Sequence, residues 1–159
     1  LISSVPSAAS AGIAQMALAV ADGAVGSNGF APTWYKTHNS THYENSSTEL
    51  MATDSSITFY CEIDCSVLIM HQGLVMHNEE VGRVDVFIQI DGSTVFRELS
   101  YPYGYFGQVN GQGLFDLPAG IHTVEVMFAN NQLFEGTAKY YGDSSGTWDY
   151  LYVMRFAQN

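Results

Sequence analysis

Side chains that could carry chemistry are few, and the histidines are the first candidates. His71 and His77 bracket a short apolar run next to Glu79 and Glu80. Two imidazoles and two carboxylates in a loop could hold a cation, but the loops of a chain with a formal net charge of −11 carry acidic side chains in any case. His122 follows a turn and starts a strand on its inward phase, as structural histidines do. These residues therefore predict neither a metal site nor a general base.

The sequence contains none of the common catalytic motifs. It has no Gly-x-Ser-x-Gly, no Gly-rich phosphate loop and no His-Glu-x-x-His. The segment Asp143–Asp149 offers oxygen ligands but lacks the ligand density of a calcium loop, so we interpret it as a turn. We expect the protein not to be an enzyme and to use no cofactor and no bound metal.

The most distinctive loop candidate is the Tyr- and Gly-rich stretch 100–113. Its aromatic side chains are Tyr101, Tyr103, Tyr105 and Phe106, which stand among Gly, Asn and Gln residues. Rigid amphipathic rings beside amide hydrogen-bonding groups make a good contact surface. Three alternatives stay open: the rings stack on sugars, they contact a neighbouring subunit or capsid protein, or they pack as an edge of the domain.

Composition narrows the range of partners. Five Lys and Arg stand against 16 Asp and Glu, and charged residues make up 13% of the chain, about half of the ~25% usual for soluble domains. Nucleic acids and membranes are excluded as partners, because phosphates and anionic lipids attract clustered cationic side chains. The aromatic content of 13% excludes a disordered chain. Many rings with little charge favour a surface buried against copies or partners; the alternative is an extracellular β-protein coated with Ser, Thr and Asn.

From Glu49 onward the hydrophobic pattern has a period of two, which is typical of half-buried strands. The odd positions of 57–69 are apolar and predict one long strand. Shorter alternating segments follow at 84–90, 95–99, 114–117, 124–128, 136–141 and 148–156, and Asp91-Gly92 is a hairpin signal. About eight strands with Gly-, Asn- and Asp-rich turns predict an all-β antiparallel sandwich or barrel.

Both cysteines, Cys61 and Cys65, fall on the predicted long strand. Four residues of straight strand separate two Cα atoms by about 13 Å, whereas a disulfide needs about 7 Å or less. Their spacing is also a poor zinc signal, because no second cysteine pair and no histidine accompanies them. We therefore predict two small buried hydrophobic residues that do not pair with each other.

The last predicted strand is apolar on both faces. Its odd face carries Leu151 and Val153. Its even face carries Trp148, Tyr150, Tyr152, Met154 and Phe156. A strand that is apolar on both sides should be covered on both sides. One face can lie on the core, and we expect the aromatic face to form the subunit interface of a homotrimer.

The first 47 residues are expected to stand apart from a domain at 48–159. Residues 1–35 contain a single charge, Asp22, and the segment 10–21 could form one short helix. It is too interrupted for a membrane span and has too few large side chains for a core of its own. We expect it to attach the domain to a neighbour through Ile13, Met16, Leu18 and Val20. A polar stretch, 36–48, would form a linker or an exposed loop, and it contains glycosylation sequons at Asn39 and Asn45.

Two segments carry a family resemblance. Leu117–Phe128, which reads LPAGIHTVEVMF, and Asp149–Phe156, which reads DYLYVMRF, resemble the closing strands of jelly-roll virion proteins of tailed bacteriophages. Such proteins decorate heads, form head fibres or associate with tails. The order of strands and turns is also similar to the trimeric tumour-necrosis-factor-like jelly roll. The resemblance covers roughly residues 48–157 and implies a jelly-roll fold, a structural or adhesive role, and no conserved chemistry.

These observations together predict a non-enzymatic structural protein of a virus particle. It would be located in the virion, form a homotrimer through its last strand and bind other virion proteins through its N-terminal segment. The alternative is a carbohydrate-binding module or lectin-like adhesin that contacts a host surface glycan through the loop 101–106.

Overall fold

The structure, a computed structural model, describes residues 32–79, 82–102, 106–131, 135–142 and 149–157. They form ten strands, and no helix is found among them. The strands are β1 (Thr33–Thr37), β2 (Tyr43–Asn45), β3 (Met51–Cys61), β4 (Cys65–His77), β5 (Val84–Ile90), β6 (Ser93–Ser100), β7 (Phe106–Leu117), β8 (Gly120–Asn130), β9 (Ala138–Tyr141) and β10 (Tyr150–Ala157). The predicted all-β antiparallel sandwich is confirmed, with ten strands rather than about eight.

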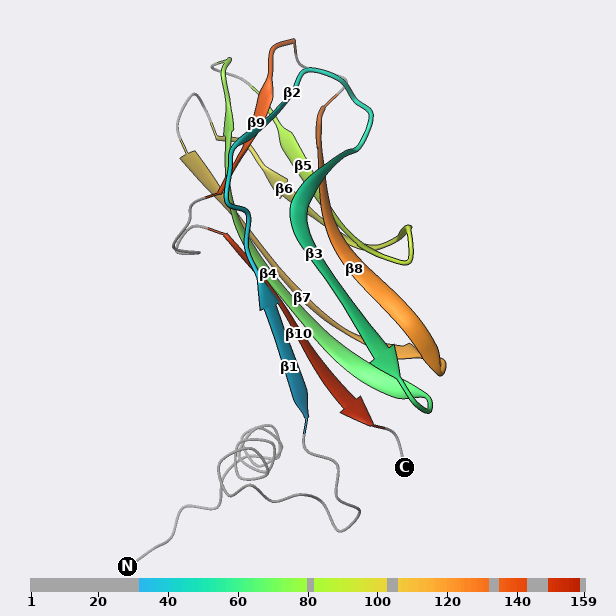
Figure 1. Ribbon diagram of the computed structural model, residues 1–159. Coiled ribbons are helices and arrows are strands. Elements are labelled where there is room, and N and C mark those ends of the chain that lie inside the picture. Colours follow the sequence, from blue (N-terminus) through green and yellow to red (C-terminus); the bar gives the residue numbers. More distant parts are fainter. Residues whose placement is uncertain (1–31, 80–81, 103–105, 132–134, 143–148, 158–159) are drawn as a thin grey trace, which may run out of the picture.

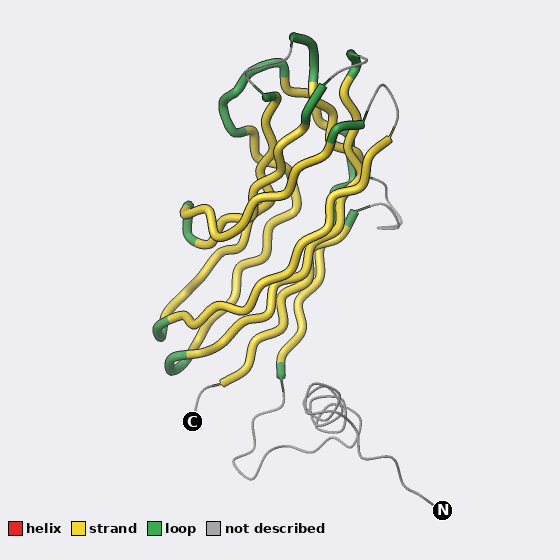
Figure 2. The backbone as a smooth tube through the Cα atoms, turned by 180° about the vertical axis from the view of Figure 1, so that it is seen from behind, coloured by secondary structure: helices red, strands yellow, loops and turns green. Residues whose placement is uncertain are grey.

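Two antiparallel sheets face each other (Figure 1). The four-stranded sheet has the order β3-β8-β5-β6. In the six-stranded sheet β4 is the central strand: β7 pairs along one of its edges, and β10 and β9 share the other. β1 extends this sheet beyond β10, and β2 extends it beyond β9. Figure 2 shows the same strands from behind, with tight turns at the end near the C-terminus and longer loops at the opposite end.

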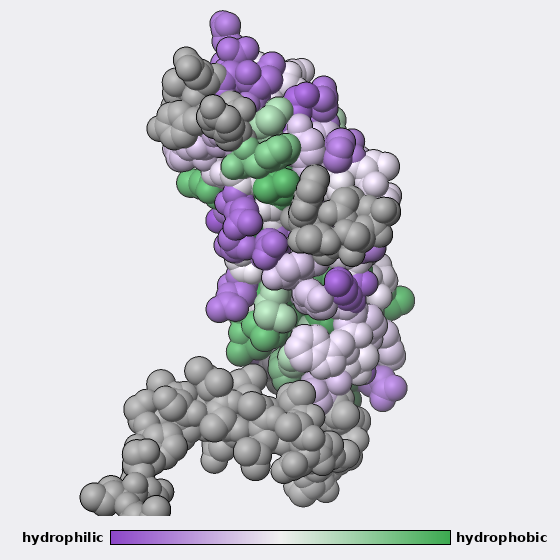
Figure 3. All heavy atoms as spheres, turned by 90° about the vertical axis from the view of Figure 1, so that its left-hand side faces the viewer, coloured by the Kyte–Doolittle hydropathy of each residue, from purple (hydrophilic) through white to green (hydrophobic). Residues whose placement is uncertain are grey.

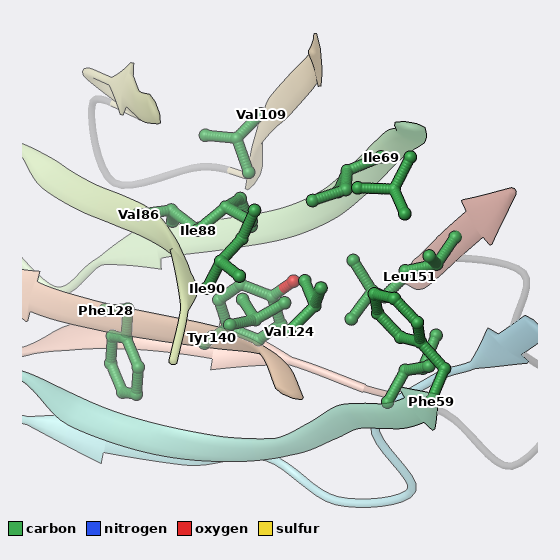
Figure 4. Packing of buried hydrophobic residues seen from close by; sticks show 14 of the residues in the cluster. Phe59, Ile69, Val86, Ile88, Ile90, Val109, Val124, Phe128, Tyr140 and Leu151 are labelled. Atoms are coloured by element: carbon green, nitrogen blue, oxygen red, sulfur yellow. The ribbon is translucent and has the colours of Figure 1, made fainter. Parts of the chain in front are cut away.

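The core lies between the sheets and is built by strict alternation. Odd residues of β3, β4 and β10 and even residues of β5 and β8 point inward, as the period of two predicted. Even residues of β9 point inward as well. Figure 4 shows several of these side chains meeting between the sheets. The largest apolar members with no exposure are Phe128, Ile69, Ile88 and Leu151. Each such aliphatic or aromatic side chain contributes about 1.5–3 kcal/mol when it is withdrawn from water.

The predicted long strand 57–69 is wrong, because the chain reverses at Glu62–Asp64. β3 ends at Cys61 in the four-stranded sheet, and β4 begins at Cys65 in the six-stranded sheet. Ile63 fits the apolar phase of the pattern, yet it is 48% exposed at the turn. The turn brings the two cysteine Cα atoms to 5.9 Å, and a disulfide joins them. The prediction that they stay unpaired is therefore wrong as well, since it assumed a straight strand.

Two further expectations about loops differ from the structure. β1 overlaps the start of the expected linker and β2 lies entirely within it, and both pair with strands of the six-stranded sheet. Ordered β-structure therefore starts before the domain boundary expected at residue 48. The stretch 106–113, expected as part of a Tyr-rich loop, belongs to β7 and pairs with β4 along its whole length. The Asp91-Gly92 hairpin is confirmed, with positive φ at both residues, as a tight β-hairpin turn requires.

The disulfide yields a direct test. An alkylating reagent applied to the native protein without reductant should modify neither cysteine, as mass spectrometry would detect. Replacing both residues, Cys61→Ser with Cys65→Ser, should lower the free energy of unfolding by about 2 kcal/mol, the chain-entropy value for a loop this short. Reductant should bring the wild type down to the stability of the variant and leave the variant unchanged. Alkylation of either thiol before reduction would contradict the pairing.

Candidate interaction surface

The last strand is apolar on both faces, as its sequence predicts. β10 lies between β1 and β4, and its odd residues Leu151 and Val153 are fully buried in the core. Its even residues project from the outer side of the six-stranded sheet. Of these, Tyr150, Tyr152 and Phe156 are half-buried and Met154 is buried. Trp148 lies outside the described residues.

The register of the neighbouring strands extends this apolar character. Met154 pairs with Trp34 on one side and with Leu68 on the other, and Leu114 follows on β7, so four strands contribute one continuous apolar row. Trp34 is 47% and Leu114 is 65% exposed. We call this surface the outer apolar face. Its members are Trp34, Leu68, Met70, Leu114, Tyr150, Tyr152, Met154 and Phe156.

Contacts within the face hold some of its rings in place. The rings of Tyr150 and Tyr152 meet edge to face at 4.8 Å, and the Lys36 ammonium lies 5.1 Å from the centre of the Tyr152 ring. A shallow hollow of about 400 Å³ opens beside Tyr150, between Asn110 and Gln112. Figure 3 looks at the molecule from the left-hand side of Figure 1, where hydrophobic patches alternate with polar ones.

The two described aromatic residues of the predicted loop, Tyr101 and Phe106, do not lie on a shared surface. Tyr101 is 49% exposed, and its hydroxyl lies 3.5 Å from a guanidinium nitrogen of Arg83. Phe106 is 56% exposed and starts β7, where its ring meets that of Tyr141 edge to face at 4.9 Å. These two side chains therefore have different neighbours. Tyr103 and Tyr105 lie outside the described residues, as do Ile13, Met16, Leu18 and Val20 of the expected attachment segment.

A polar network that sequence reasoning missed lies inside the sandwich. His71 points inward from β4, and its Nδ1 is 2.9 Å from a carboxylate oxygen of Glu98 on β6. Its Nε2 is 2.7 Å from the hydroxyl oxygen of Tyr140, and that hydroxyl donates to Asp149 at 2.5 Å. Both ring nitrogens then act as donors, so the imidazole carries two protons. Strand phase was an available signal for His71, because residue 71 continues the odd inward positions of β4. The alternation in 95–99 does not single out Glu98 as an inward residue.

The ionisation of this network follows from its surroundings. Burial alone would lower the pKa of His71, but the neighbouring carboxylates of Asp149 and Glu98 outweigh it and raise the pKa above its ordinary value. Burial, together with the charge of Asp149, raises the pKa of Tyr140 well above its ordinary value, which keeps its hydroxyl protonated. One imidazolium thus offsets part of the charge of two buried carboxylates.

Asp149 also holds the segment after β1 and the strand β3 in place. One of its oxygens accepts the backbone N–H of Asn39 at 2.5 Å and the hydroxyl of Ser55 at 3.1 Å. The Asn39 side chain is fully buried and accepts two backbone N–H groups, and Asn45 is 5% exposed. Both sequon asparagines are therefore part of the packed fold rather than of an exposed linker.

The remaining histidines with buried rings have structural partners. His77, expected in a loop, is the last residue of β4, and its Nε2 lies 3.0 Å from the Asn130 side-chain oxygen. His122 contacts Asp91 at 2.7 Å and the Pro118 carbonyl at 2.8 Å, which confirms the structural role predicted for it.

Within the described ranges, no three His, Cys, Asp or Glu side chains are grouped closely enough to hold a metal ion. The same residues include no helix of a length and hydropathy suited to crossing a membrane.

Comparison with known proteins gives information about the fold of this chain and about no other property. No family model matches the sequence, and no curated protein matches it. The crystal structure of murine APRIL at pH 8.0 is similar over 79% of this chain and 100% of that chain, with 10% identity and a TM-score of 0.54. Eiger TNF from S. frugiperda covers 77% of this chain and 94% of its own, with 8% identity and a TM-score of 0.46. The structure of the infectious bursal disease virus Gx strain covers 82% of this chain and 37% of its own, with 11% identity and a TM-score of 0.46.

The likeness to murine APRIL supports the predicted jelly-roll fold. At 10% identity it says nothing about ligands or partners, and the predicted affiliation with bacteriophages has no counterpart among these three structures.

Removal of the Tyr140 hydroxyl tests the buried network. Tyr140→Phe keeps the ring but removes the oxygen that links His71 to Asp149. The free energy of unfolding should fall by about 1–3 kcal/mol, the cost of leaving buried polar groups without a partner. Tyr60→Phe is the matched control, because Tyr60 is 53% exposed, and it should change stability by less than about 0.5 kcal/mol. Equal stability of the two variants in denaturant titrations would contradict the network.

Proposed function

We propose that this protein is a non-enzymatic structural component of a virus particle, of the head-decoration, head-fibre or tail-associated kind. It associates with itself through the outer apolar face, with β10 at the centre of the contact. The observation that carries the proposal is the apolar row that runs from Trp34 through Met154 and Leu68 to Leu114. Monomeric soluble proteins rarely expose contiguous apolar patches larger than a few hundred Å², and such patches often mark interaction sites.

The composition of this face suits self-association. Aromatic residues and Met are enriched at the centre of protein interfaces, and charged residues are depleted there. Tyr150, Tyr152, Met154 and Phe156 follow this pattern, and the nearby Lys36 ammonium already contacts the ring of Tyr152. The similarity of the strand order to trimeric tumour-necrosis-factor-like jelly rolls favours three copies around one axis.

The N-terminal segment suits attachment to other virion proteins. The described chain enters the six-stranded sheet at β1, next to β10, so the segment joins the domain at the sheet that carries the outer apolar face. Ile13, Met16, Leu18 and Val20 would supply its contacts. The disulfide between Cys61 and Cys65 supports a location exposed to oxidising conditions, such as the surface of a virion.

Self-association has a matched pair of test variants. Leu114 is 65% exposed on the outer apolar face, and Ile121 is 71% exposed on β8 in the opposite sheet. Native mass spectrometry of the wild type at micromolar concentration should show a homotrimer. Leu114→Lys should convert the trimer to a monomer, because each copy would bury an unpaired ammonium group. Ile121→Lys adds the same charge and should leave the trimer intact.

Two results would contradict this proposal. A wild type that is monomeric at micromolar concentration would exclude the trimer. Dissociation by Ile121→Lys to the same extent as by Leu114→Lys would show that the contact does not lie on the outer apolar face.

A second candidate function is the binding of a host surface glycan. The hollow beside Tyr150 favours it, because an aromatic ring next to the amide groups of Asn110 and Gln112 offers stacking and hydrogen bonds to a sugar. Glycan binding and self-association can occur in one protein, but a trimer contact that covers Tyr150 would close the hollow.

A glycan array probes this second function. The wild type should bind a defined set of glycans, and the variant Tyr103→Ala with Tyr105→Ala should lose that binding if the aromatic loop takes part. Asn110→Ala with Gln112→Ala should lose it if the hollow is the site. An array without binding, or binding that survives both variants, would rule the function out.

A further inference from the structure

The outer side of the four-stranded sheet carries a second pocket of different chemistry. It has a volume of about 340 Å³, at the lower end of the range of ligand pockets, roughly 300–1,000 Å³. Asp85 and Phe87 of β5 form part of its lining, since they alternate with the inward residues Val84, Val86 and Ile88. Arg83 and Arg97 border the pocket, and Thr48 and Asn131 add polar groups.

A buried carboxylate holds the two arginines in place. Asp85 is 4% exposed. Its two oxygens lie 2.7 Å from Nε and 3.0 Å from a terminal nitrogen of Arg83. Arg97 donates to the same carboxylate, and the amide nitrogen of Asn131 lies 3.4 Å from it. Asp85 therefore fixes two planar guanidinium groups before any ligand arrives, which reduces the ordering cost of binding.

The pocket is cationic in a chain that is otherwise strongly acidic. It gathers two of the five Lys and Arg residues of a protein with a formal net charge of −11. Two guanidinium groups against one carboxylate leave an excess of one positive charge. Each guanidinium has five N–H donors, more than Asp85 can accept. The side chain of Arg97 is 43% exposed, so donors remain open to solvent.

Aromatic rings and uncharged polar groups complete the pocket. The guanidinium of Arg97 lies 5.1 Å from the centre of the Phe87 ring, and that of Arg83 lies 6.0 Å from the centre of the Tyr101 ring. The rings limit the freedom of both cations. The Thr48 hydroxyl can meet the hydroxyl groups of a sugar, and the Phe87 ring offers an apolar surface in the same lining.

We infer that this pocket binds the carboxylate of an acidic sugar residue, with Arg97 and Arg83 as the partners of the carboxylate. Arginine forks match the geometry of a carboxylate, and the volume suits one ring. The inference goes beyond self-association and does not depend on it. The pocket lies on the four-stranded sheet and the outer apolar face on the six-stranded sheet, so a trimer formed through that face leaves the pocket open.

Titration of the isotope-labelled full chain, followed by NMR chemical shifts, tests the inference. Glucuronate should shift the amide signals of Arg97, Phe87 and Asn131 with a Kd of about 1 mM, as expected for a ligand of this size. Glucose has the same ring without the carboxylate and should bind at least about tenfold more weakly. The dipeptide Gly-Asp carries carboxylates without a sugar ring and should also bind more weakly than glucuronate.

Three variants locate the binding. Arg97→Gln should weaken glucuronate binding about tenfold or more, because it removes the more exposed cation. Arg97→Lys keeps the charge without the fork, so it should weaken binding less; it also serves if Arg97→Gln does not fold. Lys139→Gln removes one cation outside the pocket and should leave the Kd unchanged.

Several outcomes would overturn the inference. They are equal binding of glucose and glucuronate, tighter binding of Gly-Asp than of glucuronate, and shifts confined to residues outside the pocket. A loss of affinity in Lys139→Gln equal to that in Arg97→Gln would also overturn it, since the effect would then come from net charge.

Discussion

A buried imidazole held between two carboxylates is the constraint on which the sandwich depends. His71 belongs to the six-stranded sheet, Glu98 to the four-stranded sheet, and Asp149 to the segment that leads into β10. Removal of one partner would leave an uncompensated buried charge, which costs several kcal/mol. The same Asp149 accepts hydrogen bonds from Asn39 and Ser55, so the network also fixes the chain between β1 and β3.

This network accounts for glycines that look like loop residues in the sequence. Gly111 lies directly opposite His71 on β7, and a Cβ there would clash with a Glu98 carboxylate oxygen. A Cβ at Gly73 would come within 2.5 Å of the Tyr140 hydroxyl. Both glycines make room for buried polar side chains. β7 can therefore pair with β4 over its own whole length, which places Leu114 in the outer apolar face.

The two outer sides of the sandwich differ in chemistry, and the proposed roles follow this difference. The six-stranded sheet shows aromatic and aliphatic side chains with little charge, a composition suited to contact between copies. The four-stranded sheet carries two arginines fixed by the buried Asp85, a composition suited to an anionic ligand. Because the two surfaces lie on opposite sheets, the proposed contact between copies through one would leave the other accessible.

Strand phase, a local property, was readable from the sequence. It predicted the inward faces of β3, β4, β5 and β8, the structural role of His122 and the two-sided last strand, while the residue pair Asp91-Gly92 predicted its turn. Only the tertiary structure decided where the chain reverses at Ile63, that Cys61 and Cys65 pair, and that 106–113 is a strand. It also decided that His71, Glu98 and Asp149 meet, and that Arg83 and Arg97 share Asp85. Alternation shows which side of a strand is buried, but contacts between residues distant in sequence depend on how whole strands pair and pack.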